Sequence, residues 1–460
     1  MDRRPNYSTI FTAAGQIRSG HLTAQELLQR CLAQIDAFES RVHAWVLVDE
    51  PGAREAARRA DDEIGQGRDR GPLHGIPIGI KDLCDVAGWP TLAGSPLRAA
   101  HRAASDATVV ARLREAGAII LGKTVTTEFA SFDPPPTRNP WNLERTPGGS
   151  SSGSAAAVAL GMCLGAIGSQ TGGSITRPAS FCGVAGCKPT FGRVSGQGVV
   201  PLSRHMDHVG PIARSVGDLA AMLGVIAGYD PADPTTVDVR VDDYVRACRG
   251  APPPRLAILD EAFFLEGLFH RMMDAILKCS NAFEAAGAEV RVAHLPESFS
   301  EVIPLHRRIM TAEAAEYHQA MFREHGDRYG KHIGGLIEEG LASRAVDYAA
   351  ALLHRRTLQR ELLASFGDEI DALITPATTS TAPGVETTGD PKFNSPWSYV
   401  GYPTVSFPCG LADDGLPIAL QFVGRPLQEA RLLAAASWCE GALGFRPAEE
   451  LRARLVPHVR

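Results

Sequence analysis

The chain has 460 residues, of which 44% are hydrophobic and 21% are charged, and its formal net charge is −6. This composition is that of a globular protein large enough to bury an extensive core. A net negative charge gives no basic field for nucleic acid or for an anionic membrane surface, so we expect a small-molecule partner, no nucleic acid and no membrane.

The N-terminus predicts no signal peptide, because charged residues, Pro5 and Gly15 interrupt any apolar segment. The longest apolar run, residues 155–168, is shorter than the ~18 residues that a membrane span requires. The nine cysteines lack C-x-x-C spacing, which favours reduced thiols, and we interpret the closest pair, Cys182 and Cys187, as buried apolar residues. We therefore expect a cytoplasmic protein with no metal ion and no other cofactor.

Short apolar runs alternate with helical patterns along most of the chain. Residues 23–62 predict two helices, and from residue 76 onward strand-like and helix-like segments follow one another. This alternation is typical of an α/β protein, and we expect a large mixed, mostly parallel twisted sheet covered by helices on both faces. The expected strands are 76–80, 118–121, 164–168, 255–259, 289–293, 372–375, 404–407 and 418–424, and the expected helices are 108–116, 154–162, 268–286 and 341–365.

Two short motifs match known signatures but lie in the wrong context. Residues 117–124, GAIILGKT, fit the phosphate-loop pattern G-x-x-x-x-G-K-[ST], yet the residues between the glycines are apolar and predict a buried strand. We interpret Lys123 as a charge at the end of that strand. Residues 149–153 fit G-x-S-x-G around Ser151, but a nucleophile elbow needs a strand directly before the serine, and the preceding residues are polar and turn-like. The sequence therefore predicts neither a phosphate loop nor a nucleophile elbow.

Two clusters rich in glycine and serine form a stronger candidate site. Ser150 and Ser174 lie 24 residues apart, separated by one expected helix and one expected strand, so the chain returns close to its starting point and the two serines can meet. Gly172 and Gly173 allow a tight turn that directs consecutive N–H groups at one point, which is the geometry of an oxyanion hole. No histidine or carboxylate lies near Ser174 in the sequence to accept its proton.

These blocks closely resemble the amidase signature family, whose members hydrolyse the C–N bond of amides and related carbonyl compounds with a Ser-cisSer-Lys triad. The resemblance covers most of the chain, and its segments are 75–82 (GIPIGIKD), 122–130, 148–190, 207–220, 401–410 and 415–424. We expect a single domain, 1–460, with catalytic core blocks in 65–230 and a helical lobe near the substrate entrance in 295–345.

The resemblance implies that Ser174 is the nucleophile, that Ser150 is the bridging serine after a cis peptide bond, and that Lys81 is the base. It assigns the oxyanion hole to the backbone N–H groups of Thr171, Gly172, Gly173 and Ser174. Lys81 accepts a proton only when it is neutral, so its pKa must lie well below the usual value of about 10.4. The apolar neighbours Ile78 and Ile80 favour such a decrease, because burial disfavours the charged amine.

The chain departs from the family pattern beside the nucleophile. The family often has Asp before the nucleophile turn and Arg two residues after the serine, whereas this chain has Gln170 and Thr176. If those two charges form an ion pair in the family, their joint loss leaves no unpaired buried charge. Arg177 lies one position late, and Ser152 replaces a common glycine, where its hydroxyl lies close to the bridging serine or caps the following helix.

The leading hypothesis is a stand-alone amidase that hydrolyses a small amide or a carbamate through a serine acyl-enzyme, as a monomer or a homodimer. One alternative is the amidase subunit of a tRNA-dependent amidotransferase, which shares these motifs and passes ammonia to a partner. Another is a non-catalytic binding protein with the same fold, although the intact triad residues weigh against it. Candidate walls of the acyl pocket are residues 133–142, Phe299, Ile303, Ile309, Tyr317 and Met321.

Overall fold

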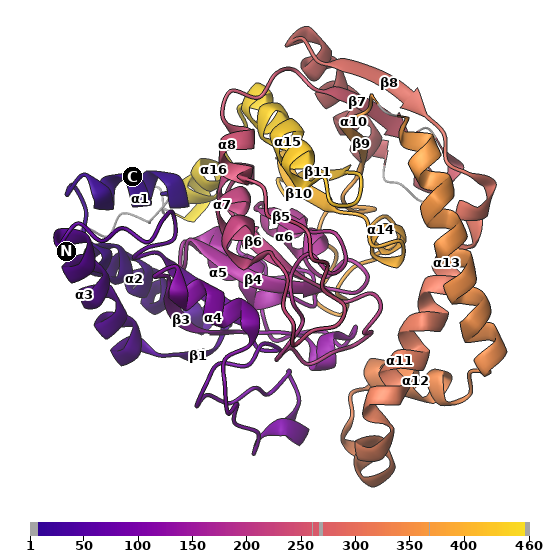
Figure 1. The fold of residues 1–460 in the computed structure, drawn as a ribbon, viewed down its shortest axis with the longest axis horizontal. Helices are drawn as coiled ribbons and strands as arrows, with labels where there is room; N and C mark the ends of the chain where they lie inside the picture. The colour runs from indigo at the N-terminus through magenta and orange to yellow at the C-terminus, as the bar shows by residue number, and fades with distance from the viewer. Residues whose placement is uncertain (1–7, 260, 266–269, 368, 456–460) are drawn as a thin grey trace.

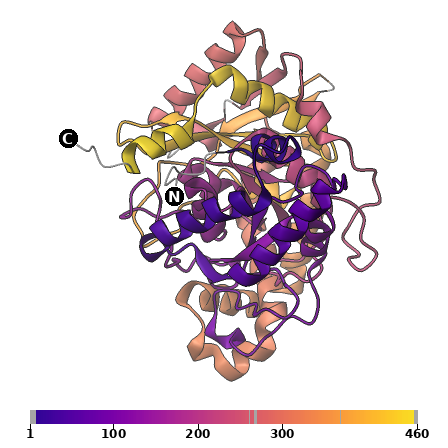
Figure 2. The same ribbon diagram turned by 90° about the vertical axis from the view of Figure 1, so that its left-hand side faces the viewer.

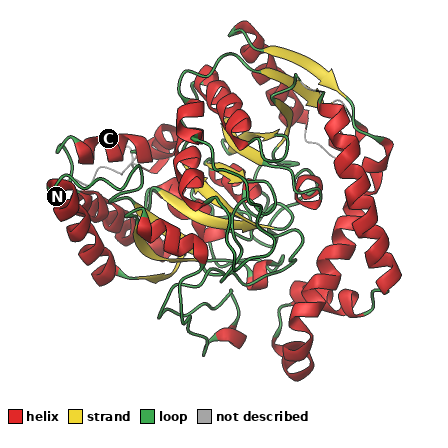
Figure 3. Cartoon of the chain, viewed as in Figure 1, coloured by secondary structure: helices red, strands yellow, loops and turns green. Residues whose placement is uncertain are grey.

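The computed structural model describes residues 8–259, 261–265, 270–367 and 369–455, and its strands form one sheet. The strands are β1 Trp45–Val48, β2 Pro77–Lys81, β3 Ile119–Thr124, β4 Gly165–Gln170, β5 Ala185–Lys188, β6 His208–Ala213, β7 Arg255–Leu259, β8 Glu289–Ala293, β9 Ala372–Pro376, β10 Thr404–Leu411 and β11 Pro417–Val423. Their order across the 11-stranded sheet is β1-β3-β2-β4-β6-β5-β10-β11-β9-β7-β8. Figure 3 shows the strands running through the molecule with helices outside them.

Helices precede, separate and follow these strands (Figure 1). The helices are α1 Ile10–Arg18, α2 Ala24–Val42, α3 Glu50–Gly65, α4 Thr108–Glu115, α5 Ser152–Leu160, α6 Thr176–Cys182, α7 Val216–Ile226, α8 Tyr244–Cys248, α9 Ala262–Leu265, α10 His270–Ala285, α11 Val302–His325, α12 Lys331–Leu341, α13 Ala345–Phe366, α14 Ser395–Tyr399, α15 Glu429–Leu443 and α16 Pro447–Leu455. No helix in the described part of the chain is long and apolar enough to cross a membrane.

The sheet is mixed, as expected, and its parallel pairs lie in two blocks. Parallel pairing joins β2 to β3 and β4 in one block, and β7 to β8 and β9 in the other. The remaining neighbours, in the middle of the sheet and at β1, pair antiparallel. The sheet is therefore less parallel than the sequence pattern suggests.

Three strands that the sequence pattern does not predict account for most of the antiparallel pairs, and the predicted strand β11 adds the others by pairing antiparallel with β10 and β9. β5 is four residues long and β6, HVGPIA, contains glycine and proline, so both lack a clear apolar signal. β1, WVLV, is apolar but only four residues long. All three pair antiparallel with their neighbours. All the strands and helices that the sequence predicts form, although residues 268 and 269 of one expected helix lie outside the described residues.

The middle of the sheet packs against helices built from small residues. All nine residues of α5, SGSAAAVAL, are buried, and the helix contacts β2, β3, β4 and β6. A helix that is apolar on every side can only lie inside a protein, and its alanines let it approach the strands closely. The α5 helix therefore fixes the loop that precedes it, which contains Ser150.

A helical lobe made of α11, α12 and α13 lies at one side of the molecule. Figures 1 and 2 show these helices in orange, away from the N-terminal helices α2 and α3 in indigo. α11 packs against both α12 and α13, and it also contacts α14. Most of the segment expected as a lobe, 295–345, lies in α11 and α12, and the helical region continues to the end of α13 at Phe366.

Candidate active site

Lys81 lies at the end of β2, a buried strand in the first parallel block. β2 and β4 run side by side with Ile80 opposite Ile167, so the residues that end both strands meet at one edge. The Nζ atom of Lys81 lies 2.9 Å from Oγ of Ser169 and 2.7 Å from Oγ of Ser150. The Lys81 side chain is 0% exposed, and this burial lowers its pKa to about 7, against a smaller opposing influence of Cys84 and Asp207. Lys81 therefore loses its proton near neutral pH.

The loop before α5 brings Ser150 to Lys81. The Gly149–Ser150 peptide bond is cis, as the family resemblance implies. Ser150 is fully buried, and its carbonyl accepts a hydrogen bond from the N–H of Thr127 at 3.2 Å. Ser151, the central residue of the rejected G-x-S-x-G motif, hydrogen-bonds through its hydroxyl to the backbone of Ser169. Ser151 thus ties the α5 loop to β4, and this contact holds Ser150 beside the lysine.

The turn after β4 presents a series of unpaired N–H groups. Three backbone carbonyls of this turn accept hydrogen bonds. The donor to the Thr171 carbonyl is Nε2 of His306, the donor to the Gly172 carbonyl is Oγ of Ser398, and the donor to the Gly173 carbonyl is the N–H of Arg177. In the described residues, no acceptor pairs with the backbone N–H groups of Thr171, Gly172, Gly173 and Ser174. Such consecutive free donors can bind the negative oxygen of a tetrahedral intermediate. A side chain at Gly173 would meet Asn394, since its Cβ would lie 2.6 Å from Oδ1.

Ser174 follows this turn and lies beside Ser150. The N–H of Ser151 donates to the carbonyl of Ser174 at 3.3 Å, which joins the two serine loops. Ser174 is 8% exposed, whereas Ser150 and Lys81 are 0% exposed. Among the described residues, the Ser174 hydroxyl makes no hydrogen bond with either of them, so the direct contact is between Lys81 and Ser150. Lys81 and Ser150 are thus fully buried, and Ser174 is the most exposed of the three residues.

The two departures beside the nucleophile contact each other. Oε1 of Gln170 accepts hydrogen bonds from the N–H groups of Ile175 and Thr176 and from Oγ1 of Thr176, at 2.8, 3.0 and 3.1 Å. Nε2 of Gln170 donates to Oγ of Ser398. Both positions therefore face each other, as the proposed loss of an ion pair requires, and a neutral hydrogen-bonded pair occupies them.

Arg177 and Ser152 both contact the loop that carries Ser150. Nη2 of Arg177 donates to the carbonyl of Gly149 at 2.8 Å, and burial lowers the pKa of this guanidinium to about 10. Ser152 is the first residue of α5, and its hydroxyl donates to the carbonyl of Gly148 at 2.9 Å. The N-cap of α5 is Ser151, so the interpretation of Ser152 as the cap is wrong. The Ser152 hydroxyl instead stabilises the loop that carries Ser150.

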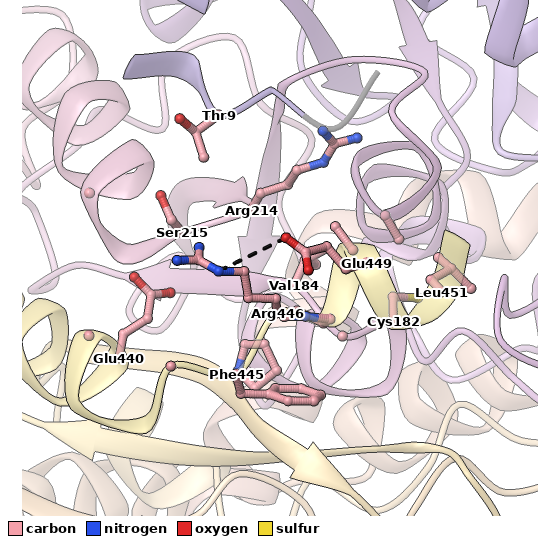
Figure 4. A pocket seen from close by; sticks show the side chains of 18 of the residues that line it. Thr9, Cys182, Val184, Arg214, Ser215, Glu440, Phe445, Arg446, Glu449 and Leu451 are labelled. Atoms are coloured by element: carbon pink, nitrogen blue, oxygen red, sulfur yellow. Dashed lines mark ion pairs between the residues drawn. The ribbon is translucent and has the colours of Figure 1, made fainter. Parts of the chain in front are cut away.

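Two cavities border the site on different sides. A cavity of about 200 Å³ is lined partly by Ser169 and Asp207 and lies on the lysine side. Another, of about 310 Å³, is lined by Phe132, Ile303, His306, Arg307, Met310, Asp390, Pro391, Lys392 and Ser395. A further cavity of about 440 Å³, shown in Figure 4, lies between α15, α16 and the end of α6, and none of the triad or oxyanion residues lines it. The 310 Å³ cavity, which we call the α11 cavity, is the candidate acyl pocket.

The expected pocket walls are only partly correct. Ile303 lines the α11 cavity, and Phe132 lies directly before the expected segment 133–142. Phe299 and Ile309 are instead buried in the core of the lobe, and Tyr317 and Met321 pack against that core. A helix turns its apolar residues to different sides, so periodicity alone does not separate core from pocket.

Several polar residues of the site escape sequence reasoning. Ser169 lies within the segment 148–190 and could be found from the parallel pairing of its strand, β4, with β2. Asp207, which accepts a hydrogen bond from Oγ1 of Thr171 at 2.5 Å, and His306 lie far along the chain. Only the packing of the lobe brings His306 to the turn. Lys123 lies near the end of β3, as expected, but it is fully buried, and its Nζ atom lies 2.6 Å from Oδ1 of Asp82.

A mixed α/β sheet with a serine hydroxyl, a buried lysine and free N–H groups defines a class of serine hydrolases that act on carbonyl compounds. The chain belongs to the Amidase family, whose model matches residues 26–433. Hydrolysis of a C–N bond is thus the reaction class of this enzyme.

Curated proteins and solved structures with similar sequences support this assignment. An amidase of Pseudomonas putida is 40% identical over 446 residues, covering 93% of this chain and 94% of that protein. A glutamyl-tRNA(Gln) amidotransferase subunit of Prochlorococcus marinus (strain MIT 9211) is 36% identical over 475 residues, covering 94% and 97%. A solved structure, described as a vestigial protein complex that reveals the origins of an s-triazine catabolic enzyme, superposes with a TM-score of 0.90 at 30% identity, covering 96% of this chain and 100% of that chain.

Proposed function

We propose that the protein is a stand-alone amidase in which Ser174 is the nucleophile, Ser150 relays its proton and Lys81 is the base. The observation that carries this assignment is the contact of 2.7 Å between Nζ of Lys81 and Oγ of Ser150 in a fully buried site. A neutral lysine there accepts the Ser150 proton while Ser150 accepts the proton of Ser174.

The first half-reaction forms an acyl-enzyme. Oγ of Ser174 bonds to the substrate carbonyl carbon, and the N–H groups of residues 171–174 bind the oxygen that becomes negative. The C–N bond then breaks, and the leaving nitrogen takes the proton that Lys81 returns through Ser150. In the second half-reaction, water gives its proton through Ser150 to Lys81, and its oxygen attacks the acyl carbon. The bond between Oγ of Ser174 and the acyl carbon then breaks, Ser174 takes the proton back, and the carboxylic acid leaves.

The substrate we propose is a small amide, and carbamates share the same tetrahedral chemistry. The cavities of about 310 and 200 Å³ on the two sides of the site support a small-molecule substrate. We also propose that the chain acts in the cytoplasm as one domain, 1–460, and as a monomer or homodimer. The nine free cysteines among the described residues support a reducing compartment.

The test compares wild type with Ser174→Ala on aryl amides, aliphatic amides, glutamine and aryl carbamates, measuring amine release. We expect wild-type turnover to fall by on the order of 10³-fold or more in the variant. Ser180→Ala is the matched control, because the Ser180 hydroxyl is also buried in this region but only donates to the carbonyl of Thr176. Full activity of Ser174→Ala would refute the assignment of the nucleophile.

The similarity to the amidotransferase subunit favours a second candidate function, release of ammonia for a partner protein. The same panel separates the two functions. Turnover of amides other than glutamine and asparagine by the isolated chain would support the stand-alone amidase. Ammonia release from glutamine alone, or only after addition of a partner protein, would support the amidotransferase.

A further inference from the structure

The helix α11 reaches the oxyanion turn directly through His306. Nε2 of His306 lies 2.9 Å from the carbonyl oxygen of Thr171, and both residues are buried. A carbonyl oxygen only accepts hydrogen bonds, so Nε2 carries the proton. Burial lowers the pKa of His306 to about 4, which keeps the ring neutral at pH 7. A neutral donor from the lobe therefore fixes the first residue of the turn.

The same helix holds Thr171 by a second, indirect route. The Thr171 hydroxyl donates to Oδ1 of Asp207, whose Oδ2 accepts the N–H groups of Leu202 and Ser203. Glu313, two turns beyond His306 on α11, accepts hydrogen bonds from the Ser203 hydroxyl at 2.6 Å and from His205. Tyr348 of α13 also donates to Glu313. The carbonyl and the hydroxyl of Thr171 are thus both held by groups that depend on the position of α11.

His306 is also part of the wall of the α11 cavity, with Ile303 and Met310 from the same helix. The cavity wall touches the turn: a Cβ atom built on Gly172 would lie 3.2 Å from Oγ of Ser395 and 3.9 Å from Cε1 of His306. None of the triad residues and none of the turn residues 171–174 lines this cavity, which meets the turn through His306 and Ser395. In the proposed mechanism the leaving nitrogen takes its proton from Ser150 on the lysine side, which leaves the α11 cavity for the acyl group.

We propose that His306 is a positioning residue that couples occupation of the α11 cavity to the geometry of the oxyanion turn, so that the acyl group determines kcat. This inference rests on the proposed amidase function. An apolar acyl group that packs on Phe132, Ile303 and Met310 holds α11 against the turn, and His306 transmits that contact to Thr171. The substrate class is therefore an amide whose acyl part carries a ring or a branched apolar group, and a short acyl group such as acetyl leaves this coupling unused.

The test measures kcat and KM for the p-nitroanilides of acetic acid and phenylacetic acid. Wild type should have the larger kcat on the phenylacetyl substrate. In His306→Ala and His306→Phe the kcat on the phenylacetyl substrate should fall about tenfold with little change in KM. The kcat on the acetyl substrate should fall less, because only the coupling to the α11 cavity is specific to the larger acyl group, so the preference disappears. His306→Gln should retain most of the preference, because its amide N–H can donate to the Thr171 carbonyl.

Two controls make the outcome decisive. His325→Ala changes an exposed residue in the last turn of the same helix and should behave as wild type. The Phe and Gln variants keep a large side chain, so they remain informative if the Ala variant fails to fold. A phenylacetyl preference in kcat that survives in His306→Phe, or a loss that appears only in KM, would overturn the proposal. Turnover that persists in Ser174→Ala would instead refute the proposed nucleophile, so the two failures are distinguishable.

Discussion

Lys81 and Lys123 lie on neighbouring parallel strands and are both fully buried, yet their surroundings differ. β2 and β3 pair with Ile80 opposite Lys123 and with Lys81 opposite Thr124, so the two lysines point to opposite faces of the sheet. Asp82, the residue after Lys81, reaches the face of Lys123 and forms an ion pair with it. Among the described residues, Nζ of Lys81 hydrogen-bonds to the hydroxyls of Ser150 and Ser169 and to the carbonyl of Ser169.

This contrast fits the role of base that we propose for Lys81 and a structural role for Lys123. A carboxylate at 2.6 Å stabilises the charged amine of Lys123, whereas hydroxyl partners leave the desolvation of Lys81 uncompensated and lower its pKa to about 7. The two lysines are equally buried and one strand apart, so the roles that we propose for them differ because of their partners. Substitution of each lysine by methionine should therefore have different consequences.

Among the substitutions that follow from this comparison, Lys81→Met should cause the largest loss of activity. We expect kcat/KM to fall by on the order of 10³-fold, because no group remains to accept the Ser150 proton. The melting temperature should not fall, since methionine fills the space without a buried amine. Steady-state kinetics and thermal unfolding of the same preparation test both statements. A variant that retains more than a tenth of the wild-type activity would contradict the assignment of Lys81 as the base.

Lys123→Met should have the opposite profile. It leaves the carboxylate of Asp82 buried without its partner, so we expect a loss of about 3–5 kcal/mol in the free energy of unfolding. The folded fraction should keep kcat within a few-fold of wild type. Denaturant unfolding measures the loss, and the double variant Lys123→Met/Asp82→Asn should recover part of it, because it removes the unpaired charge. An unchanged stability of the single variant would show that the ion pair contributes nothing.

The pH dependence of the wild type should report the state of Lys81. The base works only when neutral, so kcat/KM should fall about tenfold per pH unit below a pKa near 7 and level off above it. Asp207, whose pKa burial raises to about 6, also titrates in this range. In Lys81→Met, the pH profile of the residual kcat/KM should therefore lack the decrease that the wild type shows below a pKa near 7 (the acidic limb). If that limb persists unchanged in the variant, another group controls it.

The sequence allowed prediction of the residues whose chemistry lies in local blocks, and it failed where packing brings distant segments together. The expected contact of Lys81 with Ser150 and the turn at 171–174 form because β2, β4 and α5 are adjacent units of one α/β pattern. The short strands β5 and β6 carry too few apolar residues for a periodic signal. His306 meets Thr171 only through the fold of the lobe, and the pairing of Lys123 with Asp82 depends on the register of two strands.

Thr176→Val tests whether stability and activity depend on the hydroxyl in the uncharged pair of Gln170 and Thr176. The substitution removes the hydroxyl contact with Oε1 of Gln170 but keeps the backbone N–H on the same oxygen. Because that oxygen retains two N–H donors, we expect a loss of about 1 kcal/mol or less in stability and a change in kcat/KM of about twofold. Ser180→Ala removes one buried hydroxyl from the same helix and should cost a similar amount. A tenfold loss of activity in Thr176→Val alone would mean that this hydroxyl, rather than the backbone, orients Gln170 and the nucleophile turn.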